Sequence, residues 1–149
     1  MTYASSKQQA NLRAVFCVAA EICHRGAWAD VVIKPPSLVM AGREKGQLKV
    51  AIRVNMRRSG DWQPGLPKDS DPKADFRILV DTEGDKIPDD GDYYIVSETE
   101  FRRWVLDDHE RNTRPYGGQR ALGGNSNHKR VTISDARKLD RGWDALGIF

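Results

Sequence analysis

The clearest pattern in the chain is an alternation of apolar and polar side chains between Leu48 and Met56. Successive side chains of a β-strand point to opposite faces of its sheet, so this alternation predicts a strand with one apolar face. Shorter apolar runs predict four further strands, at residues 27–33, 37–41, 76–80 and 93–96. The second face of the alternating strand carries Lys49, Ala51, Arg53 and Asn55.

Apolar residues recur at helical spacing in three other segments. We expect helices over residues 6–24, from Ser97 or Thr99 to residue 112, and from Ser134 to Gly147. The order of these elements predicts an α/β (α+β) fold. It consists of a single mixed β-sheet of four to five strands flanked by helices.

Polar segments separate these elements. Residues 57–74 are rich in Gly and Pro and hold Trp62, and residues 82–92 are acidic. Residues 113–130 contain four glycines without apolar periodicity, which predicts a long, flexible loop. A length of 149 residues suits one core, so we expect residues 1–149 to form a single domain.

Composition excludes several classes of protein. No run approaches the ~18–20 apolar residues of a membrane span, and the first residues lack the layout of a secretory signal. We therefore expect a cytoplasmic protein without membrane contact. Cys17 and Cys23 fall on different faces of the first predicted helix, so we expect buried, reduced thiols rather than a disulfide or a zinc site.

Charge is distributed unevenly along the chain, although the net charge is only +3. Residues 43–58 carry six basic side chains and one acid, and residues 61–100 carry twelve acids and four bases. Residues 111–141 are basic again, with eight Lys or Arg against two acids. This distribution is compatible with a positive patch for phosphate contacts and with an ordinary solvated surface folded against itself.

Several short motifs follow one another along the chain. They are Ala29-Asp30-Val31-Val32, Val50-Ala51-Ile52-Arg53-Val54, Trp62, Asp75-Phe76, Leu79-Val80-Asp81, Tyr94-Ile95-Val96, Phe101–Trp104 and the ending Arg141–Gly147. This series resembles small, uncharacterised members of the PD-(D/E)XK restriction-endonuclease-like superfamily, over roughly residues 8–147. The resemblance implies a restriction-endonuclease-like fold.

The resemblance also implies a site. Such nucleases hold Mg²⁺ between an Asp on one strand and an acid or Gln on another, with a Lys two residues after the second position. Asp30 matches the first position, but Ala51 stands at the second and Arg53 at the Lys position. We therefore expect no catalysis, no cofactor and no metal site, with Asp30 and Arg53 as remnants of the catalytic site. Asp30 is the candidate ligand if a metal ion binds at all.

The leading interpretation is a non-catalytic, nuclease-like domain that binds DNA or a nucleic-acid-processing partner. The residue types that contact phosphates and stack on bases lie on the polar strand face, in the adjoining loop and in the Gly-rich loop. The candidate contacts are Lys49, Arg53, Arg57, Arg58, Trp62, Lys129 and Arg130.

Two alternatives remain open. One is a metal-dependent DNA endonuclease with a rearranged site, in which Asp30 acts with Glu44, Asp75 or Asp81 and binds Mg²⁺. The other is a protein-binding inhibitor or accessory factor from a mobile element or defence system. Its contact surface would be the acidic stretch 81–92.

Overall fold

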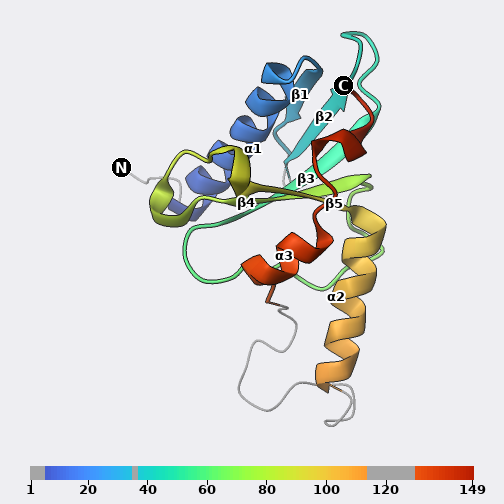
Figure 1. Cartoon of the computed structure of the whole chain (residues 1–149). Helices are drawn as coiled ribbons and strands as arrows, with labels where there is room; N and C mark the ends of the chain where they lie inside the picture. The colour runs from blue at the N-terminus through green and yellow to red at the C-terminus, as the bar shows by residue number, and fades with distance from the viewer. Residues whose placement is uncertain (1–5, 35–36, 114–129) are drawn as a thin grey trace.

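A computed structural model describes residues 6–34, 37–113 and 130–149 of the chain. Its elements follow the sequence order predicted from the hydrophobic pattern (Figure 1). They are α1 (Ser6–His24), β1 (Trp28–Val32), β2 (Leu38–Gly42), β3 (Val50–Arg57), β4 (Phe76–Asp81), β5 (Tyr93–Ser97), α2 (Glu98–Thr113) and α3 (Ile133–Leu139), with 3₁₀ turns at Glu83–Asp85, Asp90–Asp92 and Trp143–Leu146.

The five strands form one mixed sheet in the order β1-β2-β3-β4-β5. β1, β2 and β3 are antiparallel neighbours, β3 and β4 run parallel, and β4 and β5 are antiparallel. The predicted fold class is therefore confirmed: the protein is an α+β fold with a single mixed sheet flanked by helices. The restriction-endonuclease-like assignment stays a prediction.

One face of the sheet packs against α1 and the end of the chain. The apolar side chains of the alternating strand, including Ile52 and Val54, point to this face and contact the buried α1 residues Val15, Val18 and Ile22. Trp143, Leu146 and Ile148 complete the same core. The alternation in the sequence thus marks the face that α1 covers.

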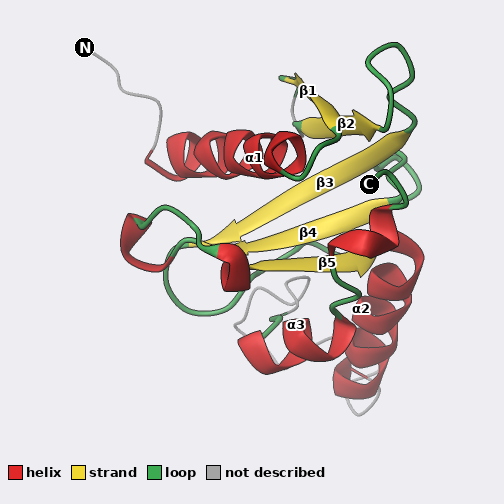
Figure 2. Ribbon diagram, turned by 45° about the horizontal axis from the view of Figure 1, so that its top comes forward, coloured by secondary structure: helices red, strands yellow, loops and turns green. Residues whose placement is uncertain are grey.

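The opposite face is covered at its β4–β5 end. Leu79, Tyr94 and Val96 pack there against Phe101 and Val105 of α2, Ala136 of α3 and the buried ring of Trp62. Figure 2 shows α2 and α3 gathered at this end of the sheet, with β1 and β2 at the far end. The loop between β3 and β4 brings Trp62 onto this face, where backbone hydrogen bonds of 3.0 and 2.9 Å join Trp62 to Val131.

Three expectations need correction or fall outside the described residues. The last helix ends at Leu139, and Trp143–Leu146 form a separate 3₁₀ turn because Asp140 has an extended backbone. Cys17 and Cys23 are free, but Cys17 is half-buried and Cys23 is exposed, because α1 turns both away from the centre of its core-facing side. The loop predicted at residues 113–130 lies outside the described residues for 114–129.

Among the helices of the described ranges, none is long and apolar enough to cross a membrane.

Candidate nucleic-acid interface

The second face of β1, β2 and β3 is open. The strand register places Asp30, Met40 and Ala51 in one row across this face, and Val32, Leu38 and Arg53 in another. In the described part of the chain, α1 is the helix packed against β1 and β2, and it covers the other side of the sheet. We call this surface the open sheet face and define it by Trp28, Asp30, Val32, Leu38, Met40, Ala51 and Arg53.

Trp28 is the aromatic residue of the open sheet face. Its side chain is 48% exposed, and the Lys45 ammonium lies 5.7 Å from the centre of its ring. A cation over an indole face is attracted by the electron density of the ring, so Lys45 from the β2–β3 hairpin helps to orient it. Sequence reasoning missed Trp28, although its spacing of two from Asp30 places both side chains on one face of a strand.

Arg53 supplies positive charge at the other side of the open sheet face. Its guanidinium is mostly buried and lies 3.8 Å from Asp71, which also pairs with Arg102 at 3.5 Å. Burial lowers the pKa of Arg53, and the neighbouring charge of Arg77 lowers it further. Glu98 and Asp71 act in the opposite direction, so Arg53 lies among charges of both signs with Asp71 as its ion-pair partner.

Lys49 extends this positive charge along β3. It lies two residues before Ala51, and its side chain is exposed. Trp28, Lys45 and Lys49 are therefore exposed around one surface that combines an aromatic ring with cations, and the mostly buried Arg53 lies at its side.

The two positions of the implied metal site lie in one row but not next to each other. Asp30 and Ala51 both pair with Met40, so β2 separates them. Two strand spacings amount to about 10 Å between their Cα atoms. Within the described ranges, no group of three or more His, Cys, Asp or Glu side chains is arranged to hold a metal ion.

The acids proposed as partners of Asp30 serve other contacts. Asp75 accepts a hydrogen bond of 2.8 Å from the backbone N–H of Ala51, which extends the pairing of β3 with the start of β4. Asp81 pairs with Arg57 at 2.7 Å. Glu44 is exposed in the β2–β3 hairpin, where its backbone bridges to Gln47.

Arg57 and Arg58 do not belong to the open sheet face. Arg57 is 7% exposed, donates a hydrogen bond to the Gly60 carbonyl and pairs with both Asp81 and Glu83. The guanidinium of Arg58 donates two hydrogen bonds, of 2.7 and 2.8 Å, to the carboxylate of Asp85. Two of the six basic side chains of residues 43–58 are thus paired with the acidic stretch 81–92, because the parallel pairing of β3 with β4 brings the ends of these strands together.

The acidic stretch is largely occupied by the same contacts. Asp81, Glu83 and Asp85 bind the two arginines, and Asp92 pairs with Lys86 at 3.1 Å while accepting the backbone N–H of Asp89. These internal contacts leave less free acidic charge for a protein partner than the sequence suggested.

Trp62 cannot stack on a base in this structure. Its ring is 1% exposed, its indole N–H donates to the Val80 carbonyl at 3.1 Å, and Tyr94 packs against it edge to face. Of the two predicted contacts in the last loop, Lys129 lies outside the described residues. Arg130 is exposed next to Val131, which pairs with Trp62.

No family model, curated protein or solved structure matches this chain. The resemblance to the PD-(D/E)XK superfamily therefore stays a prediction that these comparisons do not test. The function has to be argued from the open sheet face itself.

Proposed function

We propose that this protein is a non-catalytic, nuclease-like domain that binds single-stranded nucleic acid through the open sheet face. The observation that carries the proposal is the exposed ring of Trp28 on the same uncovered surface as Arg53, with Lys45 and Lys49 at its border. A cytoplasmic location, where such strands occur, fits the proposal.

Single strands are commonly bound by this combination of groups. Bases stack on exposed aromatic rings, often on an open sheet surface, while Lys and Arg follow the phosphates. The ion pair of Arg53 with Asp71 is long, at 3.8 Å, so a phosphate at the exposed part of this mostly buried side chain would add a closer charged contact. Asp30 lies between Trp28 and Arg53 on this face, and it disfavours phosphate close to the centre of the face.

The non-catalytic part of the proposal rests on the residues at the implied metal site. Ala51 offers no side-chain oxygen, Arg53 replaces the Lys, and Asp75 and Asp81 are engaged by a backbone N–H and by Arg57. The endonuclease alternative would need these acids to leave their partners. Nicking assays with Mg²⁺ or Mn²⁺, comparing wild type with Asp30→Ala, test it directly.

Fluorescence anisotropy with labelled single-stranded DNA and RNA oligonucleotides tests the binding function. We expect Trp28→Ala to weaken binding by about 5- to 150-fold, since stacking on an aromatic ring contributes ~1–3 kcal/mol per base. We expect Arg53→Gln to weaken binding and to reduce the slope of log affinity against log salt by about 0.7.

Two matched variants serve as controls. Phe16→Ala removes a ring that is also 48% exposed but lies on α1, and Arg103→Gln removes an exposed cation of α2. Both should bind like wild type. Absence of salt-dependent binding at low salt, or equal losses in the Trp28 and Phe16 variants, would overturn the proposal.

A further inference from the structure

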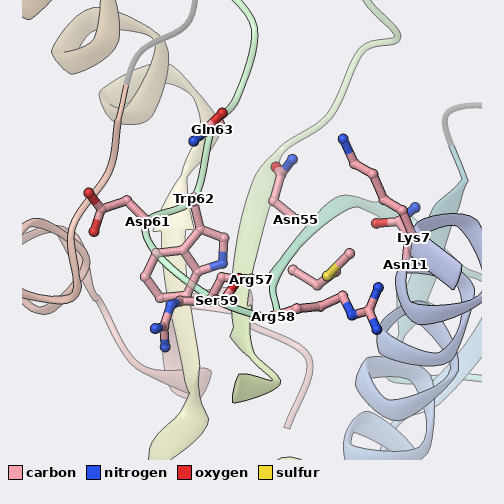
Figure 3. A pocket seen from close by; sticks show the side chains of 10 residues that line it. Lys7, Asn11, Asn55, Arg57, Arg58, Ser59, Asp61, Trp62 and Gln63 are labelled. Carbon is pink, nitrogen blue, oxygen red and sulfur yellow. The ribbon is translucent and has the colours of Figure 1, made fainter. Parts of the chain in front are cut away.

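A cavity of about 390 Å³ opens at the end of β3, next to the open sheet face. Figure 3 shows Asn55 of β3 between two walls, with Lys7 and Asn11 of α1 on one side and Trp62 and Gln63 of the β3–β4 loop on the other. Asn55 is two residues beyond Arg53, so both side chains belong to the same face of β3. The cavity therefore continues the surface proposed to bind a strand.

Asn55 carries an unusual polar atom. Its side-chain oxygen, Oδ1, is buried and has no hydrogen-bond partner among the described residues. A buried acceptor without a donor is unfavourable, because its hydrogen bond to water is lost on burial and no other hydrogen bond replaces it. A ligand that donates an N–H to this oxygen would satisfy it, once the Asn55 amide turns its oxygen towards the cavity; no contact of Arg57 or Trp62 fixes this amide.

The walls of the cavity are held firmly before any ligand arrives. Arg57 is fixed by Asp81 at 2.7 Å and by the Gly60 carbonyl at 2.5 Å, which sets the path of the loop. Trp62 is fixed by its indole hydrogen bond and by its backbone pairing with Val131. Such a rigid site loses little conformational freedom when a ligand binds.

We infer that this cavity receives one unstacked base of the bound strand, and that the amide of Asn55 binds the polar edge of that base. This inference rests on the proposed function for the class of ligand. Each base that carries an N–H beside an acceptor complements an amide, which offers one oxygen acceptor and one N–H donor. The cavity is also in the size range of small-molecule sites, ~300–1,000 Å³.

The charges around the cavity fit a nucleotide better than a free anion. Lys7 is an exposed cation in the cavity wall and is suited to a phosphate. The Asn55 oxygen instead needs a donor, which inorganic phosphate supplies poorly because its oxygens act mainly as acceptors. A phosphate alone would leave the buried oxygen unsatisfied.

Titration of the ¹⁵N-labelled protein with adenosine 5′-monophosphate, followed by NMR, tests the inference. Purine riboside 5′-monophosphate is the matched ligand, since it lacks the exocyclic amine and its base offers no N–H. We expect it to bind about five- to tenfold more weakly than the adenosine nucleotide, the effect of one hydrogen bond. The side-chain amide of Asn55 and the indole N–H of Trp62 should shift with the adenosine nucleotide, and inorganic phosphate should not shift the amide.

Asn55→Leu should abolish the difference between the two nucleotides, while Gln47→Leu, which removes an exposed amide of the β2–β3 hairpin, should preserve it. Equal binding of the two nucleotides by wild type would overturn the inference even if the Asn55 variant failed to fold.

If oligonucleotides bind in a Trp28-dependent manner but wild type does not distinguish the nucleotides, the proposed function stands and the cavity is not a base pocket. If only the nucleotides bind, the cavity is supported and the strand-binding function fails.

Discussion

At Gly42 the lack of a side chain allows two backbone segments at the border of the open sheet face to lie close together. Gly42 ends β2 opposite Trp28, at the start of the hairpin that carries Lys45. A Cβ atom at Gly42 would lie 2.0 Å from the backbone oxygen of Gln47, closer than any side chain tolerates. Nothing in the sequence around Gly42 indicates this close approach, which is visible only in three dimensions.

We expect Gly42→Ala to destabilise the protein by about 1–3 kcal/mol, because the hairpin must shift to admit the methyl group. Urea denaturation followed by circular dichroism measures the loss. Gly46→Ala is the control in the same hairpin, since a Cβ there would meet nothing within 4 Å. Equal stability of the two variants would contradict the close approach at Gly42.

At the scale of elements, a buried ion pair joins β4 to the start of α2. The guanidinium of Arg77 donates two hydrogen bonds to the carboxylate of Glu98, at 2.9 and 2.6 Å, and both side chains are almost fully buried. The guanidinium also lies 4.4 Å from the ring centre of Phe101. The pair therefore fixes the beginning of α2 against the sheet and places Arg77 beside Arg53.

Glu98→Ala should cost about 3–5 kcal/mol, because it leaves the Arg77 charge buried without a partner. The double variant Arg77→Met, Glu98→Met should recover most of this loss, since it removes both charges. Glu100→Ala, which breaks an exposed pair with Arg141, is the control and should change stability little. Urea denaturation gives the free energy of unfolding of each variant, and a double variant no more stable than Glu98→Ala would contradict the expected recovery.

The elements were more predictable than the site. Alternation at Leu48–Met56 and the helical spacing at residues 6–24 depend on neighbours along the chain, so they located β3 and α1 within a few residues. The roles of Arg57, Arg58 and Trp62 depend on contacts with Asp81, Asp85 and Val80, which the β3–β4 pairing brings close. Patterns of neighbouring residues do not predict contacts between segments that are distant in the sequence. The exposure of Trp28 could not be predicted either, because it depends on which part of the sheet the helices leave open.

At the scale of the whole molecule, the last residues of the chain pack beside α1 on one side of the sheet. The rings of Trp143 and Tyr93 pack edge to face, with their centres 5.3 Å apart. The guanidinium of Arg25, just after α1, lies 4.8 Å from the centre of the Trp143 ring. Leu146 and Ile148 enter the same core as Val15 and Ile22 of α1. The last residues are therefore part of the fold rather than a surface tail.

We expect Trp143→Ala to lower the free energy of unfolding by about 3–5 kcal/mol through the cavity it leaves. Trp28→Ala removes an equally large but exposed ring and should have a much smaller effect. Thermal and urea unfolding of the two variants make the comparison. A large loss of stability in the Trp28 variant would also undermine its use as a probe of binding.

The position of Asp30 has a consequence unrelated to metal or nucleic acid. β1 is the first strand of the sheet, so its outer edge has no neighbouring strand among the described residues. An open edge can pair with the edge of a second molecule and lead to aggregation, which proteins counter with short strands and charged side chains. β1 is five residues long and carries Asp30 at its centre, so two copies paired edge to edge would bring like charges together. Asp30 thus helps to keep the molecules apart.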